Sequence, residues 1–407
     1  MSRDGTAEDP NVRRLSRRSI LGSTALAGAT AAATSFAIQP QAKAQVGAPL
    51  DWIDPVLSHG AVNDGSVDAS APINAAIAAA QGLGGPDSGG MVHLQRGVFL
   101  IAQTLDVGPG ITLAGAGSGT VLRAAPALVG PVVRIPAGSE HAVLADVRID
   151  ASLQEDPAGV GVLVDAGASG SRGAGPDTFV LVERVTITGT PASGVVVGQD
   201  TREARLNHVV VAGAARLSAA SAFEVRGSDG NYTNCVASGT GYTPAATPRF
   251  RPDSHGFAIG SAEGGGGNSR VIGCKAFYSG GSGFKVRARR VTVSACQSQD
   301  NNGNGFDLDG TTTSVFSGLT SDSDAQVGVL VRAGCSDLIC NGLMVLWRNP
   351  RGIPAIDRPI NGIMVEAGTE RLIIEGVVRD SVQGRVVRAA GTNPDGIWQT
   401  IPAPQDV

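Results

Sequence analysis

The sequence lacks the large aromatic side chains that fill most globular cores. Phe, Trp and Tyr make up 4% of its 407 residues, whereas glycine alone contributes 57 residues. This composition argues against an ordinary helical or sandwich core and favours a solenoid with many tight turns. A strong charge of either sign is also missing, because the formal net charge is −4. The chain therefore has no general attraction to nucleic acid or to an anionic membrane surface.

Cysteine is scarce and occurs in an odd number. Of the five cysteines, Cys235, Cys274 and Cys296 occupy the same place in successive repeats, and Cys340 fits the same slot. Equivalent slots on stacked repeats predict an internal column of small apolar side chains, so we expect buried free thiols rather than a disulfide. Whether Cys335 and Cys340 pair stays open. No spacing typical of metal ligands is present.

A long hydrophobic run suited to a membrane span is absent too. Residues 16–21 read Ser-Arg-Arg-Ser-Ile-Leu and look like a twin-arginine export signal. A weakly apolar stretch, 22–38, and a small-x-small cleavage site at 42–44 follow it. We therefore expect 1–44 to be a signal peptide and 45–407 to be one domain. The mature protein is then periplasmic or secreted, without stable membrane insertion after signal cleavage.

A short tag of glycine followed by apolar residues recurs along the chain. Seven tags begin at Gly161, Gly194, Gly256, Gly283, Gly305, Gly328 and Gly362, mostly 22 to 34 residues apart, and 222–225 is an eighth without its glycine. Each tag is typical of a short strand, and a second strand of the type Val-x-Val follows it. Periods of this size indicate stacked repeats that bury their apolar edges against their neighbours. The sequence thus predicts a coil of parallel strands.

The segment 60–117 points to one kind of coil. It contains Gly-Ala, Asp-Gly and Asp-x-Ser, an Ala-rich helix over 71–80 with Ser70 as N-cap, then Gly-Gly-x-Val, Gly-x-Phe and Leu-x-Gly-x-Gly. In this order the motifs resemble the first segment of the pectate-lyase-like superfamily, and in particular its rhamnogalacturonase/epimerase-like pectate lyase domain. The resemblance implies an all-β fold, a single-stranded right-handed parallel β-helix with a short N-terminal capping helix. We expect the capping segment at about 51–90, coils at about 91–384 and a C-terminal tail.

Alternation within the tags predicts which side chains face outward. The apolar residues point inward, so the residues between them form an outward column with about 4.8 Å between coils. In this column we expect Lys285 opposite Asp307 and Arg287 opposite Asp309, with Arg332 on the coil beyond. Small residues on the preceding coil leave a notch beside the column, which His255 and Glu263 border.

This column predicts a groove for an acidic polysaccharide. The candidate catalytic residues are Lys285, Arg287, Asp307 and Asp309, and the candidate substrate-binding residues are His255, Glu263 and Arg332. A basic group there would abstract a sugar proton α to the carboxyl group, which leads to β-elimination or epimerisation. The alternative for the same charges is a surface ion-pair ladder that holds the register of the coils.

Two further functions stay open. A glycoside hydrolase would use Asp307 and Asp309 as its pair of carboxyl groups, and 255–261 is similar to the Gly-His-Gly strand of polygalacturonase-type hydrolases. A non-catalytic β-helix would bind glycan or envelope material. No cofactor is expected, although Asp307, Asp309, Asp322 and Asp324 form an alternative calcium site. The sequence also leaves open whether the coils assemble into homotrimers.

Residues 253–310 carry a second resemblance, to polysaccharide lyase family 9. The matching text is 255–258, Gly-Cys-Lys-Ala at 273–276, 279–285, Ala-Cys-Gln-Ser at 295–298 and 304–310. The calcium carboxylates of that family fall on His255, Gly281, Ser282 and Lys285, and its base lysine falls on Asp307. None of the four is a carboxylate, so the framework is kept while the calcium-dependent site is absent.

Overall fold

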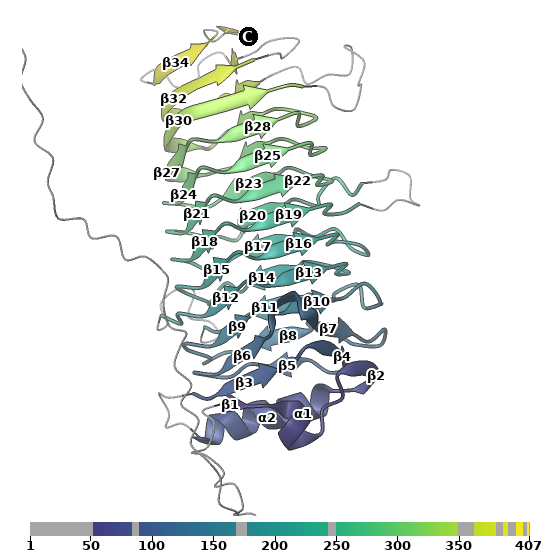
Figure 1. Ribbon diagram of the computed structural model, residues 1–407. Coiled ribbons are helices and arrows are strands. Elements are labelled where there is room, and N and C mark those ends of the chain that lie inside the picture. The colour runs from purple at the N-terminus through teal and green to yellow at the C-terminus, as the bar shows by residue number, and fades with distance from the viewer. Residues whose placement is uncertain are drawn as a thin grey trace, which may run out of the picture. The chain divides into compact units, whose positions relative to one another are not determined.

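Two parallel sheets, of 12 and 23 strands, form the sides of the stacked coils (Figure 1). The computed structural model describes residues 52–83, 89–167, 177–242, 250–348, 362–379, 386–389, 396–401 and 405–406. All of them belong to one unit, 49–407. The predicted parallel β-helix is therefore confirmed.

The 12-stranded sheet contains the tag strands. Its strands are β5 (Leu105–Asp106), β8 (Val133–Ile135), β11 (Val162–Val164), β14 (Val195–Val197), β17 (Phe223–Val225), β20 (Phe257–Gly260), β23 (Phe284–Arg287), β26 (Phe306–Leu308), β29 (Val329–Val331), β31 (Ile363–Val365), β33 (Val386–Arg388) and β35 (Gln405–Asp406). Neighbouring strands of this sheet come from successive coils, and all of them pair in parallel.

The 23-stranded sheet contains the remaining strands. They are β1 (Trp52–Ile53), β2 (Asp64–Asp68), β3 (Met91–Leu94), β4 (Gly97–Ile101), β6 (Thr112–Gly115), β7 (Thr120–Ala124), β9 (Val143–Ala145), β10 (Arg148–Asp150), β12 (Leu181–Glu183), β13 (Thr186–Thr188), β15 (Arg205–Asn207), β16 (Val210–Ala212), β18 (Asn231–Thr233), β19 (Val236–Ser238), β21 (Arg270–Ile272), β22 (Lys275–Phe277), β24 (Thr292–Ser294), β25 (Gln297–Gln299), β27 (Thr312–Ser317), β28 (Thr320–Asp322), β30 (Ser336–Leu346), β32 (Glu370–Val378) and β34 (Ile397–Ile401).

A central coil has three strands where the sequence predicted two. The expected second strand is broken at its middle by one residue with left-handed backbone, at Arg184 (φ 52°), His208 (φ 53°), Asn234 (φ 54°) and Ala295 (φ 51°). A single left-handed residue turns the chain sharply, so each predicted strand becomes a pair such as β12 and β13. None of these four pivots is glycine, the residue that usually marks such a turn in a sequence.

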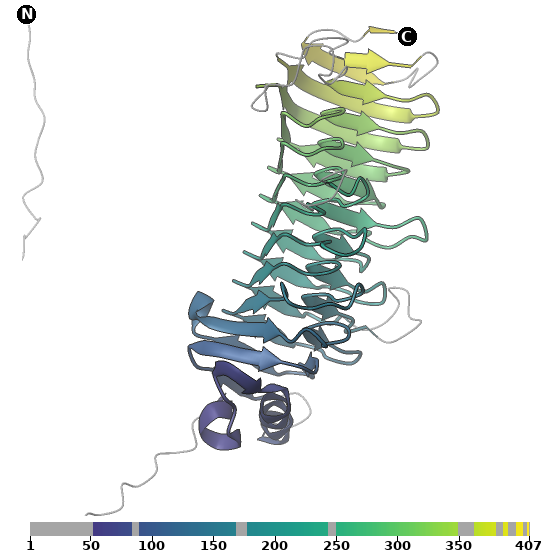
Figure 2. The ribbon, with the colours of Figure 1, turned by 90° about the vertical axis from the view of Figure 1, so that its right-hand side faces the viewer.

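Two helices cover one end of the stack, as Figure 2 shows. The predicted capping helix is α2 (Ser70–Leu83), and it is preceded by the shorter α1 (Pro55–His59). Ser70 is the first helical residue instead of the N-cap, and its hydroxyl accepts the backbone N–H groups of Ala102 and Gln103. Neither α1 nor α2 has the length and apolar character that crossing a membrane requires.

Stacked phenylalanine rings fill the centre of the core. Phe223, Phe257, Phe284 and Phe306 lie parallel on consecutive coils, with ring centroids 4.5, 4.8 and 4.9 Å apart. They occupy the first inward position of each tag, as predicted. The tag glycines serve close packing rather than turn geometry: a Cβ on Gly256 would lie 2.5 Å from the side chain of Ala276 on the opposite wall.

The five cysteines are free and buried. The thiols of Cys274 and Cys296 reach the carbonyl oxygens of Tyr232 and Val271 at 3.5 Å, and the backbone N–H of Cys235 lies 3.4 Å from Cys274 Sγ. The predicted column of thiols is confirmed for these three. The prediction that Cys340 shares this slot is wrong. Cys340 pairs in register with Phe316, and both lie in the strand segment before the left-handed residue of their coil, whereas the other three cysteines follow that residue.

The coil continues beyond residue 384. Strand β33 pairs with β31, β34 with β32, and β35 with β33, all in parallel, in the segment predicted as a closing strand and tail. The predicted signal peptide, 1–44, lies outside the described residues. So do residues 243–249 and 349–361.

Candidate functional site

The outward column predicted from the tags is present on the 12-stranded sheet. The register pairs Ala258 with Lys285, Lys285 with Asp307, and Asp307 with Leu330. These side chains therefore lie on consecutive rungs about 4.8 Å apart. Because side chains alternate between the two faces of a strand, the tag pattern is sufficient to predict this column.

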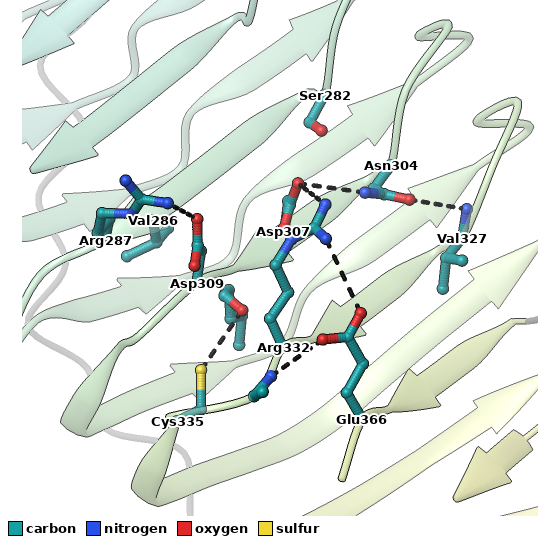
Figure 3. Close-up of polar contacts among 12 residues, drawn as sticks. Ser282, Val286, Arg287, Asn304, Asp307, Asp309, Val327, Arg332, Cys335 and Glu366 are labelled. Atoms are coloured by element: carbon teal, nitrogen blue, oxygen red, sulfur yellow. Dashed lines mark hydrogen bonds and ion pairs between the residues drawn. The ribbon is translucent and has the colours of Figure 1, made fainter. Parts of the chain in front are cut away.

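The partner of Asp307 differs from the expectation. Its carboxylate is bound by Arg332, one coil further on, with Nε 2.7 Å from Oδ1 and Nη2 3.0 Å from Oδ2 (Figure 3). Asn304 Nδ2 donates a third hydrogen bond, of 3.2 Å, to Oδ2. Lys285 is the register neighbour of Asp307 but makes no ion pair with it. A guanidinium forms two parallel bonds with a carboxylate, an advantage that an ammonium group lacks.

These contacts keep Asp307 ionised. Its side chain is only 4% exposed. Burial alone would raise the pKa of Asp307, but the hydrogen bonds and charge of Arg332, with the charge of Lys285, outweigh it and hold the pKa below its ordinary value. The same guanidinium approaches Glu366, with Nη1 3.8 Å from Oε1. Arg332 is thus shared by two carboxylates within the column.

The second predicted pair, Arg287 and Asp309, is confirmed. Arg287 lies at the end of β23, Asp309 follows β26, and their side chains form an ion pair (Figure 3). On the coils before the notch, Glu224 is bound by Ser193 Oγ at 2.7 Å and also pairs with Arg226. Most charges of the column are therefore matched within the sheet, as an ion-pair ladder requires.

His255 sits in the residue row that precedes the tags. The backbone N–H of Ser282, on the next coil, donates to His255 Nδ1 at 2.9 Å. An amide can only donate, so the neutral imidazole carries its proton on Nε2. Burial, and then the charge of Lys285, lower the pKa of His255 to about 4, so the ring is neutral near pH 7.

Gly281 makes room for this imidazole. A Cβ at Gly281 would lie 2.6 Å from His255 Nδ1 and 2.6 Å from the carbonyl oxygen of Pro252. The absence of a side chain is therefore required for His255 to reach the amide of Ser282. The sequence singled out His255 for the border of the notch, and the resemblance to polysaccharide lyase family 9 aligned His255, Gly281 and Ser282 with one site without showing this hydrogen bond.

Lys285 differs from the other described cations of the column because it has no ion-pair partner among the described residues. Among the described residues its ammonium group forms no hydrogen bond and no ion pair, although it lies beside Ala258 and near His255. Glu263, the other predicted border residue, lies exposed in the loop after β20, and its carboxylate contacts none of the other predicted site residues. The structure thus brings His255, Lys285 and Asp307 together and leaves Glu263 apart.

The four aspartates of the alternative calcium site do not meet. Asp307 and Asp309 belong to the 12-stranded sheet, whereas Asp322 ends β28 in the other sheet and pairs with Arg348. Asp324 is fully buried and accepts hydrogen bonds from Ser321 Oγ and from Asn301. Within the described part of the chain, no cluster of three or more metal-ligating side chains occurs. The prediction of a calcium site formed by these four aspartates is therefore wrong.

Sequence reasoning assigned no role to Asn304 or Glu366, which complete the surroundings of Asp307 and Arg332. Asn304 occupies the row of His255, and its Oδ1 accepts the backbone N–H of Val327, again on the next coil, at 3.1 Å. The signal in the sequence that could have identified Asn304 is that a polar residue recurs directly before the tag glycines. In Figure 3, Ser282, Asn304 and Val327 follow one another along this row.

Comparisons with known proteins agree with this architecture. Residues 166–342 match the family described as the right handed beta helix region. The A-module of the mannuronan C-5 epimerase AlgE4 of Azotobacter vinelandii superposes with a TM-score of 0.58 at 17% identity, covering 80% of this chain and 94% of that one. The Dettilon tailspike protein gives 0.62 at 13% identity, with coverages of 86% and 68%.

A third similar structure is PfbA, a surface adhesin of Streptococcus pneumoniae. Its TM-score is 0.57 at 11% identity, over 87% of this chain and 89% of that chain. Comparison with curated protein sequences found no match. At such identities a likeness in structure reports the fold, and all three structures share the one described above. The chain therefore has the right-handed parallel β-helix fold.

Proposed function

We propose that the protein acts on a uronate-containing polysaccharide and removes the proton from the sugar carbon next to the carboxyl group. Epimerisation and β-elimination both begin with this step. The observation that carries the proposal is Lys285, an amine with no ion-pair partner in the described part of the chain, placed beside the neutral imidazole of His255. A basic group and a hydrogen-bond donor at one point of an open sheet face are what this chemistry needs.

The comparisons support the class of substrate. One similar structure is named a mannuronan C-5 epimerase, an enzyme whose name specifies the uronate carbon that bears the carboxyl group. The likeness in fold carries no activity by itself. The proposal therefore rests on the side chains of this chain and takes from the comparison only a polymer to test first.

In the proposed step, Lys285 first releases its own proton to solvent, and its amine then takes the proton from the sugar carbon and becomes an ammonium ion again. The electron pair of the broken C–H bond moves into the carboxylate, which becomes an enediolate. His255 donates its Nε2–H to one oxygen of this group, as neutral imidazoles do at other developing oxyanions. Return of a proton to the opposite face of the carbon gives the epimer. Loss of the oxygen substituent on the neighbouring carbon gives an unsaturated sugar.

In this proposal, Asp307 and Arg332 take no part in the reaction and hold neighbouring coils of the groove together through their ion pair. A glycosidase needs one carboxyl group that holds a proton at working pH. The pKa of Asp307 is lowered, and Asp309 is held by Arg287. Hydrolysis by these two aspartates therefore receives no support from their surroundings. Binding without turnover would leave the ladder of ion pairs as the main role of the column.

Deuterium exchange tests the proposed step directly. The purified protein would be incubated in D2O with polymannuronate, polyguluronate and polygalacturonate, and ¹H NMR would follow the carbon next to the carboxyl group. Incorporated deuterium or a new unsaturated bond is the expected result. Lys285→Met should reduce the rate at least about 1000-fold, given the size of general acid–base effects.

Lys275→Met is the matched control. Lys275 lies in β22 on the other sheet, with Nζ 5.2 Å from the ring centre of Phe277, and should be dispensable for turnover. No exchange and no unsaturation with any polymer would overturn the proposal. Reducing ends that appear without unsaturation would instead establish a hydrolase, and saturable affinity without any product would establish a binding protein.

A further inference from the structure

A pocket of about 830 Å³ lies beside the column, where the tag strands end and the chain turns toward the other sheet. Its walls come from the connections that follow β14, β17, β20, β23 and β26 on five successive coils. This volume is within the range of sites that hold small ligands. Of the residues given candidate roles above, Arg287 and Asp309 line the pocket and Glu263 lies in one of its loops.

The pocket carries an excess of positive charge. Four arginines line it against two aspartates, Asp229 and Asp309. Arg202 lies 3.5 Å from Asp229, and Arg287 is paired with Asp309. The other two, Arg289 and Arg290, are exposed and make no ion pair within the described residues. Two guanidinium groups are therefore available to a ligand.

One wall of the pocket is backbone without side chains. Gly264 and Gly265 line it, and together with the following Gly266 they are left-handed, with φ of 99°, 100° and 69°. A Cβ on Gly265 would lie 2.2 Å from the carbonyl oxygen of Arg226, and Gly266 N donates to the same oxygen at 2.9 Å. Only glycine adopts this backbone conformation readily, so these positions require glycine. The wall therefore has no side chains here, and a ligand can approach its backbone closely.

We propose that this pocket binds the oxyanion of a sugar unit, a carboxylate or a sulfate, outside the unit that reacts. Arg289 and Arg290 supply the forked donors that planar or tetrahedral oxyanions accept in pairs. The Arg287–Asp309 pair belongs both to the column and to the pocket wall, so a polymer lying on the column reaches the pocket without leaving the surface. The pocket then determines at which sugar units the protein binds an acidic polysaccharide. This inference rests on the proposed function for the identity of the polymer.

Charge removal at the two unpaired arginines tests the pocket. The double variant Arg289→Gln and Arg290→Gln keeps hydrogen-bonding capacity but loses two charges. Titration calorimetry at low salt, where charge interactions are least screened, would use hexuronate oligomers, sulfated galactan oligomers and neutral dextran oligomers. We expect the variant to bind one class of anionic oligomer at least about tenfold more weakly than the parent protein. Where turnover occurs, KM should rise by the same factor while kcat changes less than about twofold.

The control removes two exposed arginines elsewhere, Arg148→Gln with Arg379→Gln, and should leave affinity unchanged. Thermal unfolding would verify that both double variants are folded. Weaker binding of hexuronate alone identifies a carboxylate site, and weaker binding of the sulfated oligomer alone identifies a sulfate site. Equal affinity of parent and pocket variant for both anions, or equal binding of dextran, would overturn the pocket. Because calorimetry reports binding without turnover, failure of the deuterium test and failure of the pocket are separate results.

Discussion

The ion pair of Asp307 gives the sharpest test of how the column is held. Arg332→Met would remove both guanidinium hydrogen bonds and leave a carboxylate that is 4% exposed with Asn304 as its remaining donor. Breaking a buried pair by removing one partner costs about 3–5 kcal/mol. Since the Arg332 side chain is itself 36% exposed, water replaces part of its contribution. We therefore expect a loss of about 2–3 kcal/mol in the free energy of unfolding near neutral pH.

The pH dependence distinguishes this cause from a general packing defect. In the parent protein the pKa of Asp307 is lowered, so its stabilisation is complete above the ordinary carboxyl pKa and is lost as pH falls through the folded value. In the variant, burial without the guanidinium raises that pKa. Its carboxylate is then penalised at high pH, so the stability deficit should be largest near about pH 8 and shrink toward about pH 4.

Urea unfolding followed by circular dichroism at both pH values measures these deficits. Arg371→Met is the matched control, because Arg371 pairs with Asp337, a carboxylate 40% exposed, and its loss should destabilise the fold far less than Arg332→Met. Adding Asp307→Asn to Arg332→Met should recover more than half of the loss. A deficit that is the same at both pH values, or no larger than that of Arg371→Met, would refute the reasoning.

Three further predictions follow from single side chains. Burial raises the pKa of Asp324 to about 6, so its charge destabilises the fold as pH rises from about 4 to 6; Asp324→Asn should add about 1–3 kcal/mol at pH 8 and little at pH 4 in the same urea titration. Gly281→Ala should displace the imidazole of His255 and reduce deuterium exchange at least about tenfold with a small change in melting temperature, whereas a rate unchanged from the parent would exclude a role for that ring. Phe284→Ala opens a hole in the ring stack and should cost about 3–5 kcal/mol, and a loss below about 1 kcal/mol would contradict the rigid stack.

The sequence was sufficient to predict on which coils the residues of the candidate site lie, but not which of them form ion pairs. Alternation in the tags placed Lys285 and Asp307 on neighbouring rungs, because register in a parallel sheet is a matter of counting. Arg332 was expected one coil further on, but nothing in the spacing showed that its guanidinium would reach back to Asp307. The reach of a long side chain depends on which competing partners stand within a few ångströms of it, and sequence separation does not report this.

The sequence by itself determined the repeat and the buried thiols, since both follow from motifs that recur on successive coils. It also determined the inward phenylalanines and the outward charges, since these follow from a local period of two along a strand. Tertiary structure alone decided the rest. It placed left-handed pivots at ordinary residues such as His208 and turned Nδ1 of His255 toward an amide of the next coil. Among the residues that the structure describes, it also gave Lys285 no ion-pair partner. It also gathered Arg289 and Arg290 with a glycine loop from the preceding coil. These features depend on contacts between coils more than 20 residues apart, where small differences in side-chain length decide which groups meet.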